Sequence, residues 1–296
     1  MDMTKYEAFL SAAESGSFTA AGRILGYTQS GITRMIDSLE KECGFPLFIR
    51  KKKGVELTEN GRLLLPQVRS AVRADKSVQE LTAQIKGVMR GTITLGCYFS
   101  VSAILMPDIL KTFENKYPNI QVRIREGGNL EIAKWLDEGS VDLAVCALPK
   151  TVNEICWIPL FKDRMVVWLP ASHPKAKAAA FPIKDMEKEP FIHTSPGRDT
   201  DQDRLIRDEH LHMDERYSTM DGFTTYNMVE AGLGISFNQR MISRKWHGSV
   251  CEVPLTPARY VEIGIALPLM AEASPATHIF MRHIQESEEF PHAGGQ

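Results

Sequence analysis

Apolar residues near the N-terminus recur at helical spacing. Positions three or four apart form one buried helix face, and the first such face comprises Tyr6, Phe9, Leu10 and Ala13. Ser17 and Thr19 are candidate caps for a second helix over residues 20–25. Gly26 is predicted to end that helix, because glycine takes the left-handed C-terminal conformation most easily.

A third helix and a hairpin are predicted next. Thr28 is a candidate N-cap, Gly44 is a candidate stop, and the buried stripe between them has i, i+4, i+7 spacing: Ile32, Ile36 and Leu39. Residues 47–50 and 55–57 form two short apolar segments on either side of a lysine turn closed by glycine. A polar turn with glycine between apolar segments predicts a hairpin.

Residues 58–86 predict one long helix. Thr58 is its candidate N-cap, Gly87 its stop, and Pro66 should bend it near its start because proline lacks a backbone donor. A helix with a single apolar stripe and no partner nearby in sequence packs on a second copy or lies on its own body as a spacer. We favour the dimer and keep the spacer open. The stripe comprises Leu64, Val68, Ala71, Val72, Val78, Leu81 and Ile85.

From Gly91 onward, strands and helices alternate. A strand over 92–95, a helix over 102–117, a strand from Ile120, a helix over 129–138 and a strand over 141–146 give a βαβαβ order. This order predicts a parallel sheet covered by helices, and the remaining length suffices for two small α/β lobes. The pattern continues less cleanly over 165–169, 191–194, 224–231, 235–237, 260–266 and 274–286.

Composition supports a folded protein in a reducing compartment. The 296 residues are 43% apolar and 24% charged, and no apolar run approaches the roughly 20 residues of a membrane span. The N-terminus lacks a signal-peptide pattern, and the five cysteines are scattered without a C-x-x-C pair. We therefore expect a cytoplasmic protein without membrane association, disulfide framework, zinc ribbon or other cofactor.

Charge is distributed unevenly. Residues 1–90 hold 14 Lys and Arg against 10 Asp and Glu, and the remaining residues hold 21 against 27. A basic head on an acidic body favours a polyanionic partner for the head.

The basic N-terminal part, residues 1–90, also contains the succession of elements expected of a helix-turn-helix. Two short helices flank a glycine turn, and the small residues Ala21 and Gly22 lie where the helices would cross closely. Base edges and phosphates could be reached by polar side chains early in the following helix: Thr28, Gln29, Ser30, Thr33 and Arg34. The turn of Lys51, Lys52 and Lys53 would form a wing against phosphates. The alternative is an ordinary three-helix module with a solvated lysine turn.

The chain resembles the LysR-type transcriptional regulators over essentially its whole length. Gly22 and Ser30 depart from the family pattern, which often has Ala and Pro there, and both changes are tolerable. The resemblance rests on Ser15-Gly-Ser-Phe-Thr-Ala-Ala21, Thr28-Gln-Ser-Gly-Ile-Thr-Arg34, Leu39-Glu40, Gly44 with Leu47, Phe48 and Arg50, and Leu57-Thr58-Glu59 with Gly61.

The resemblance implies an α/β chain with three parts. These are a winged helix-turn-helix over 1–58, a linker and dimerisation helix over 59–87, and an effector-binding domain over 88–296 with a fold like periplasmic binding proteins. Lobe I would take 91–162 and 267–290, and lobe II 163–266. The implied partners are operator DNA, a small effector, further copies in a dimer or tetramer, and RNA polymerase as a candidate. By position, the residues that would face the major groove are Gln29, Ser30, Thr33 and Arg34. Those that would contact phosphates or the minor groove are Arg50, Lys51, Lys52 and Lys53.

Effector residues are expected around the cleft between the lobes. Ser100 matches a position that commonly touches effector in the family, Ser102 is its neighbour, and Asn129 matches a second such position. The alternative for these three side chains is that they only cap their helices. The helix start near Ser100 favours an anion, because exposed amides and the helix dipole attract negative charge. His193, Thr194 and Phe223 are candidates for the opposite wall, although local hydrogen bonding or packing explains each. We expect an anionic or aromatic effector.

Other chemistry is poorly supported. Asp199, Asp201 and Asp203 have calcium-loop spacing, but Arg204 stands where the loop needs glycine. Peroxide sensing in one branch of the family uses two cysteines of the second lobe, where this chain has only Cys251, so we disfavour a redox switch. The alternative to a regulator is a binding protein or enzyme on the α/β body with the head as an assembly module. No catalytic spacing supports an enzyme.

Overall fold

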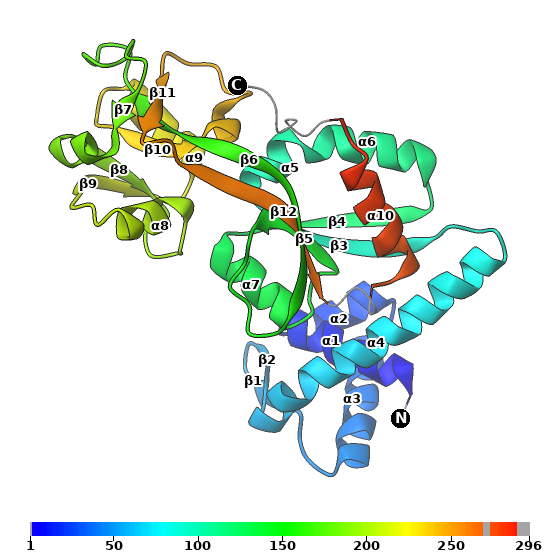
Figure 1. Cartoon of the computed structure of the whole chain (residues 1–296). Coiled ribbons are helices and arrows are strands. Elements are labelled where there is room, and N and C mark those ends of the chain that lie inside the picture. The colour runs from blue at the N-terminus through cyan, green and yellow to red at the C-terminus, as the bar shows by residue number, and fades with distance from the viewer. Residues whose placement is uncertain (1, 269–272, 289–296) are drawn as a thin grey trace. The chain divides into compact units, whose positions relative to one another are not determined.

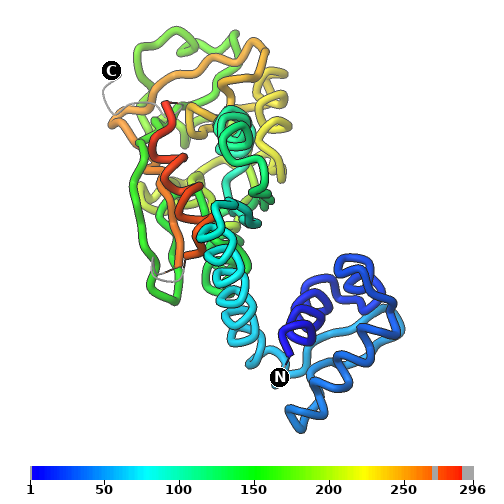
Figure 2. Tube along the Cα trace, turned by 90° about the vertical axis from the view of Figure 1, so that its right-hand side faces the viewer, coloured from blue at the N-terminus to red at the C-terminus, as the bar shows by residue number. Residues whose placement is uncertain are grey.

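The computed structural model describes residues 2–268 and 273–288 and divides into two compact units (Figures 1 and 2). The first comprises Met1–Gly91 with the turn Glu138–Ser140, and the second Thr92–Asp137 with Val141–Gln296. Residues 1, 269–272 and 289–296, which the predicted domain ranges include, lie outside the described residues.

Three helices begin the first unit: α1 (Met3–Ser15), α2 (Phe18–Leu25) and α3 (Gln29–Cys43). Ser17 caps α2 and Thr28 caps α3 through their side chains, as predicted, although α2 begins two residues earlier than expected. Gly26 and Gly44 end α2 and α3 in the left-handed conformation. The three helices share one core, because their apolar faces converge: Phe9, Phe18, Ile32, Ile36 and Leu39 are all buried.

The predicted hairpin is confirmed by β1 (Phe48–Lys51) and β2 (Gly54–Leu57), which pair antiparallel. Its turn lies against the end of α1, where the Val55 amide donates to the Gly16 carbonyl at 2.8 Å. Gly54 has φ +128°, and a Cβ there would lie 2.3 Å from the Gly16 oxygen. Only glycine therefore fits at this contact.

The long helix α4 (Glu59–Ile85) begins at the N-cap Thr58 and continues through Pro66. Its N-terminal half joins the core of the first unit through Val68 and Val72. Further along, apolar side chains are half or more exposed: Val78, Leu81 and Ile85.

The second unit contains a mixed sheet with the strand order β4-β3-β5-β12-β6-β11-β7, and β10 also pairs with β6. β3 and β5 are parallel, as predicted, but β12 runs antiparallel to both β5 and β6. The predicted parallel pairing of the first α/β segment is therefore present, and the sheet is mixed because the chain returns from the second lobe to insert β12 between β5 and β6.

The first lobe contains β3 (Gly91–Cys97), β4 (Ile120–Glu126), β5 (Leu143–Ala147), α5 (Phe99–Ile104), α6 (Met106–Lys116), α7 (Asn129–Asp137) and α10 (Pro275–Gln285). The single helix predicted over 102–117 is two helices, with the break at Leu105. Pro107 explains the break, because its ring would clash with the carbonyl four residues earlier in a continuous helix.

The second lobe is built on the C-terminal half of β6 (Ile155–Leu169), which lies between β10 (Ser236–Gln239) and β11 (Cys251–Thr256). A separate parallel pair is formed by β8 (Pro190–Thr194) and β9 (Asp214–Thr219). The remaining elements are β7 (Phe181–Pro182), α8 (Asp201–Asp208), α9 (Gly222–Glu230) and the short helices η1 (Ile183–Lys188) and η2 (Arg240–Ser243).

Two strands cross between the lobes. β6 runs unbroken from the first lobe into the second, and β12 (Tyr260–Pro268) lies antiparallel beside it from the crossing point back into the first lobe (Figure 1). Each lobe has its own core, one around Phe113 and Phe280 and the other around Phe181 and Phe237. The two lobes therefore have separate cores and share this pair of strands, while Met241 of η2 packs into the core of the first lobe.

Candidate functional site

The first half of α3 presents a polar, exposed surface. Thr28, Gln29, Ser30 and Arg34 are exposed and Thr33 is half-buried, whereas the opposite face of the helix is fully buried. The Gln29 side-chain amide donates to the Thr33 hydroxyl at 3.2 Å, so the two side chains are held together on the helix. Thr28 is partly used as the cap, since its hydroxyl accepts from the Gly31 amide at 3.1 Å.

Close packing in the turn before α3 explains Gly22. A Cβ on Gly22 would lie 2.6 Å from the Tyr27 carbonyl oxygen, so the backbone of the turn rests directly on α2. An alanine at this position would therefore require the turn to shift away from α2.

The wing beside α3 is basic and anchored. The Glu40 carboxylate accepts from the Leu47 and Phe48 amides at 2.6 and 3.0 Å, which fixes the start of β1 against the end of α3. Arg50 pairs with Asp37 and Lys51 with Glu56. Within the described residues, Lys52 and Lys53 at the wing tip form no ion pair and are exposed. These two ammonium groups are therefore available to a polyanion.

A cavity of about 340 Å³ lies between the two lobes of the second unit. Such a volume suits a small organic molecule rather than a macromolecule. The first lobe contributes Tyr98, Phe99, Ser100, Glu126, Gly127, Gly128, Asn129 and Glu131. The second lobe contributes Thr194, Ser195, Arg198, Thr200, Asp201, Gln202, Met220, Asp221, Gly222, Asn238, Gln239 and Ile242.

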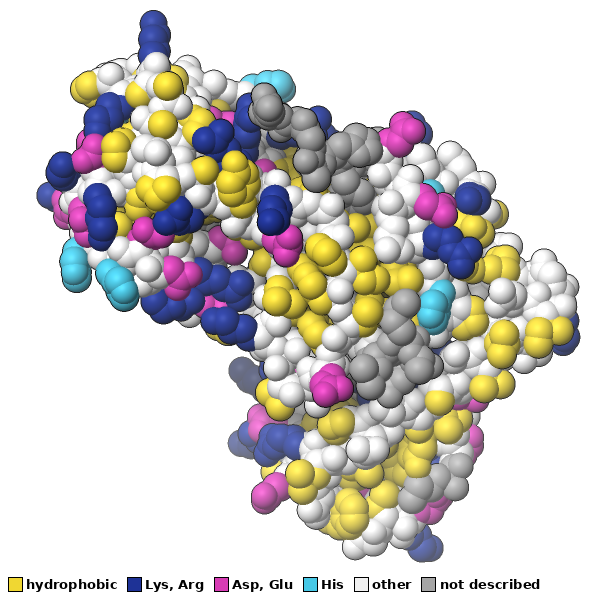
Figure 3. Space-filling model, in the orientation of Figure 1, with side chains coloured by type: hydrophobic (Ala, Val, Ile, Leu, Met, Phe, Trp, Pro, Cys, Tyr) yellow, Lys and Arg dark blue, Asp and Glu magenta, His cyan; other side chains and the backbone are white. Residues whose placement is uncertain are grey.

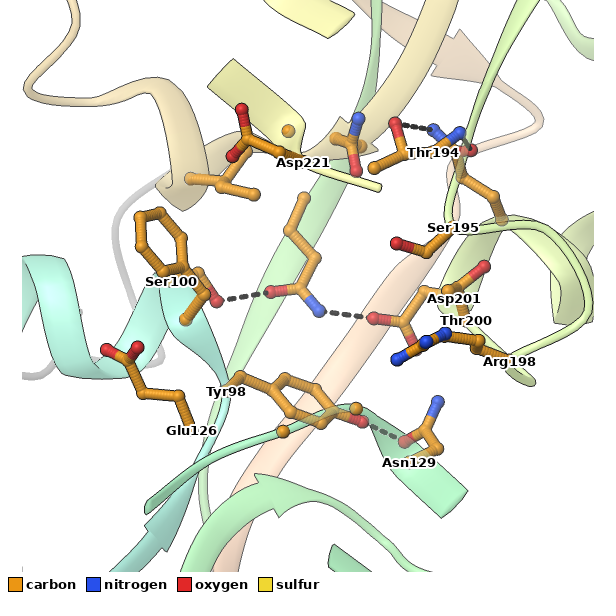
Figure 4. A pocket seen from close by; sticks show the side chains of 18 of the residues that line it. Tyr98, Ser100, Glu126, Asn129, Thr194, Ser195, Arg198, Thr200, Asp201 and Asp221 are labelled. Atoms are coloured by element: carbon orange, nitrogen blue, oxygen red, sulfur yellow. Dashed lines mark hydrogen bonds between the residues drawn. The ribbon is translucent and has the colours of Figure 1, made fainter. Parts of the chain in front are cut away.

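A chain of hydrogen bonds crosses the cavity. The Ser100 hydroxyl on α5 donates to the Gln239 side-chain oxygen at 3.5 Å, and the Gln239 amide nitrogen donates to the Asp201 carboxylate at the start of α8 (Figure 4). Burial raises the pKa of Asp201, and the hydrogen bond from Gln239 opposes that shift. A side chain of the first lobe is thus linked to a carboxylate of the second through one amide.

Two further contacts join the lobes beside this chain. The Asn129 side-chain oxygen accepts from the Tyr98 hydroxyl (Figure 4). The Asn129 side-chain nitrogen donates to the Asp199 carbonyl. Burial raises the pKa of Tyr98 well above its ordinary value, so the phenol stays protonated and remains a donor. Arg198 pairs with Glu131, with Nη1 and Oε1 3.1 Å apart. Polar contacts therefore join the two lobes around the cavity.

Three of the six predicted effector residues line the cavity: Ser100, Asn129 and Thr194. The other three, Ser102, His193 and Phe223, are not part of the lining. The Ser102 hydroxyl is taken up by Glu126 and by the Phe99 carbonyl.

His193 and Phe223 are occupied elsewhere. His193 is buried between two carboxylates, with its Nε2 2.9 Å from Asp203 and its Nδ1 2.9 Å from Glu215. Phe223 stacks edge-on against Trp246 with the ring centroids 5.3 Å apart. Both side chains therefore act within the second lobe.

Sequence reasoning missed several lining residues, above all Gln239, Asp201, Arg198 and Asp221. The sequence around Asp201 indicates only an incomplete calcium loop. In the structure Thr200 and Asp203 form a capping box at the start of α8, which a Thr-x-x-Asp spacing signals. No cluster of His, Cys, Asp and Glu suited to a metal occurs among residues 2–268 and 273–288.

The thiols near the cavity are poor nucleophiles. Burial raises the pKa of Cys97 to about 12, and burial also raises the pKa of Cys146. Because the thiolate is the reactive form, neither side chain is suited to react with peroxide. Cys251 lies apart from them on β11 of the second lobe.

Comparison with known proteins gives matches along the whole chain. Residues 3–62 match the family model of the bacterial regulatory helix-turn-helix protein, lysR family, and residues 86–289 match that of the LysR substrate binding domain. The uncharacterized HTH-type transcriptional regulator YvbU of Bacillus subtilis is 30% identical over 289 residues, which cover 97% of this chain and 98% of the relative. OxyR of Escherichia coli, a DNA-binding transcriptional dual regulator, is 27% identical over 80% of this chain and 78% of its own length.

Solved structures agree with this fold. A full-length OxyR variant from Pseudomonas aeruginosa gives a TM-score of 0.78 at 21% identity, covering 98% of this chain and 96% of the other. Full-length CbnR in complex with its target DNA gives 0.65 at 18% identity, covering 96% and 99%.

Proposed function

This chain belongs to the LysR family of transcriptional regulators, and we propose that α3 and the wing read operator DNA while the cavity between the lobes binds a small effector. The family consists of regulators rather than enzymes, so the alternative of an enzyme with an assembly head is set aside. Within the described part of the chain no helix has both the length and the apolarity to cross a membrane. The proposed site of action is the cytoplasm, where operator DNA is found.

The observation that carries the DNA-binding assignment is the surface of α3. Gln29 and Arg34 are exposed on the polar face, and Lys52 and Lys53 on the wing are exposed and form no ion pair with any residue that the structure describes. A helix of this kind enters the major groove, where Gln and Arg pair with base edges and the wing lysines meet phosphates.

We assign dimerisation to α4. Leu63, Val78, Leu81 and Ile85 are 50–79% exposed on one helix, and Figure 3 shows hydrophobic side chains along it. A run of exposed apolar side chains of this size is typical of an interface. A second copy pairing along α4 would bring two α3 helices to successive major grooves of one operator.

Effector control is proposed to act through the contacts between the lobes. Ser100, Gln239 and Asp201 form one connection, and a ligand in the cavity would compete for the same hydrogen-bonding groups. A ligand that binds one lobe arrangement more tightly than another shifts their populations by that difference in affinity. The lobe angle then changes the placement of the DNA-binding units in the assembly.

The DNA-binding assignment is tested by replacing Arg34 with alanine. A DNA fragment selected from a random library by the full-length chain serves as the probe in a mobility-shift titration. R34A should weaken binding by about 1–3 kcal/mol without changing thermal stability. R282A, which removes an exposed arginine of α10, is the matched control and should bind as the parent chain does. Equal binding by R34A and R282A would refute the groove assignment.

The effector assignment is tested by filling the cavity. Ser100 is buried in the lining, so Ser100→Trp should block ligand entry and leave operator binding intact. The measurement is reporter output from the selected operator in cells supplied with a metabolite library. A ligand response that survives in S100W would place the effector elsewhere.

A further inference from the structure

We propose that the effector cavity takes a small organic amine in its cationic form. This inference rests on the proposed function, because it names the chemical class of the ligand for the same site. It replaces the anion expected from the helix start near Ser100, since that helix, α5, has only six residues and the walls around it are acidic.

The walls carry four carboxyl groups and one guanidinium, and because burial raises the pKa of Asp201, the negative charge of the walls rests mainly on the other three. Two carboxylates, Glu126 and Glu131, come from the first lobe, and two, Asp201 and Asp221, come from the second. The guanidinium of Arg198 pairs with Glu131 across the lobes at 3.1 Å. A negatively charged ligand would meet an excess of like charge, whereas an ammonium group would be attracted from both lobes.

Glu126 and Asp221 are the carboxylates open to a ligand. Within the described residues neither forms an ion pair, and both are exposed at the cavity. Glu126 accepts from the Ser102 hydroxyl, which leaves further acceptor capacity on its two oxygens. Figure 4 shows the two carboxylates on either side of Ser100.

Asp221 keeps its charge. Burial opposes ionisation of this carboxyl, but hydrogen bonds from the hydroxyl and amide of Thr224 and the amide of Phe223 lower its pKa. The group is also the N-cap of α9, where the helix dipole favours a negative charge. A carboxylate is thus present at the cavity at neutral pH.

The nearby arginines are committed to another carboxylate. Arg204 donates to Asp199 Oδ2 from Nε and Nη2 at 3.0 and 2.8 Å, and Arg207 reaches Asp199 Oδ1 at 3.3 Å. Neither arginine is part of the cavity lining. An anionic ligand would have to displace an existing ion pair to gain a guanidinium partner, and a cationic ligand would not.

Apolar side chains in the lining indicate that the ligand also has a hydrocarbon part. Tyr98, Phe99, Met220 and Ile242 line the cavity beside the acidic groups, and Phe99 is 46% exposed. An aromatic face attracts a cation and also packs against hydrocarbon. The volume of about 340 Å³ is near the lower end for ligand sites, which favours a single ring or a short alkyl chain.

The experiment compares ligands of similar size whose head groups differ in charge. The full-length chain is titrated by calorimetry and by thermal shift with benzylamine, benzoate and benzyl alcohol, and with pentylamine, pentanoate and pentanol. We expect each amine to bind at least about tenfold more tightly than its two analogues, the difference made by one favourable ionic contact. Glu126→Gln and Asp221→Asn should each remove most of that advantage.

The variants are chosen to fold. Gln is isosteric with Glu126, and Asn is as good an N-cap as the Asp221 it replaces. Glu114→Gln removes an exposed carboxylate of α6 away from the cavity and should leave amine binding unchanged.

Three results would overturn the inference. The first is tighter binding of the carboxylates than of the amines, and the second is no binding of either amine up to about 10 mM. The third is that E126Q and D221N bind the amines as tightly as the control variant E114Q. All three leave the R34A mobility-shift result untouched, so a wrong ligand class is distinguishable from a wrong regulatory function.

Discussion

Arg198, in the loop before α8, pairs with Glu131, in the first turn of α7, with 3.1 Å between Nη1 and Oε1. The pair joins the two lobes beside the cavity. Both side chains are partly exposed, at 52% and 35%, so solvent weakens the attraction between them.

The first prediction follows from that exposure. R198A and E131Q should each lower the free energy of unfolding by less than about 1 kcal/mol, with a coupling energy of similar size in a double-mutant cycle. Urea denaturation of the two single variants and the double variant measures it. A coupling energy far above this value would mean that the pair is shielded from water and dominates lobe closure.

The second prediction concerns the wing. The slope of log K against log salt for operator binding is negative, because salt weakens phosphate contacts. Removing either Lys52 or Lys53 should make this slope shallower by about 1, since each lysine neutralises one phosphate. The loss of affinity should be nearly uniform across DNA sequences. Lys111→Ala on α6 is the control, and an unchanged slope in both wing variants would remove the wing from the interface.

The third prediction concerns the contact between the wing and α1. Gly54→Ala should cost at least about 2 kcal/mol of stability, because it combines an unfavourable φ with a Cβ 2.3 Å from the Gly16 oxygen. Gly44→Ala shares a positive φ but meets nothing within 4 Å, and should cost about 1 kcal/mol. Thermal denaturation compares them; equal losses would show that the Gly16 contact relaxes freely.

The fourth prediction is a pH dependence. Asp163 on β6 accepts from the Met241 amide at 3.0 Å, and burial raises its pKa to about 6 from 3.8 for an exposed carboxyl. Between these values the folded chain binds more protons than the unfolded chain, so the contribution of Asp163 to stability falls as pH rises through about 4 to 6, by up to about 3 kcal/mol.

Asp163→Asn tests this directly, since asparagine can still accept from Met241. The variant should gain stability relative to the parent chain as pH rises from about 4 to 7. The free energy of unfolding measured in urea at several pH values gives the comparison. A constant difference between the two chains would contradict the raised pKa.

Local signals made the first unit predictable. Ser17, Thr28 and Thr58 cap their helices, and Gly26 and Gly44 end theirs, because capping depends only on residues close in sequence. The hairpin was predictable for the same reason. Pro107 is a local signal for the break at Leu105, but the apolar spacing continues across the break and predicts a single helix.

The second unit was less predictable, because its order depends on remote pairing. β12 inserts between β5 and β6, and nothing local gives a strand its direction or neighbours. The cavity has the same property. Ser100 and Asn129 are expected from family positions. Gln239 is not, because it lies 139 residues away in sequence from Ser100, whose hydroxyl donates to it. The acidic lining emerges only when both lobes are assembled.

The passage of β6 through both lobes has a consequence for how this chain tolerates length changes. β12 already has a register irregularity against β6 between Ile263 and Gly264. Side chains alternate between the two faces of a strand. Deleting one residue of β6 near Asp163 would therefore turn the core-facing side chains of the following part of the strand, in the second lobe, to the opposite face of the sheet. We therefore expect deletions to be accepted in surface loops and rejected in this strand, however conservative the deleted residue.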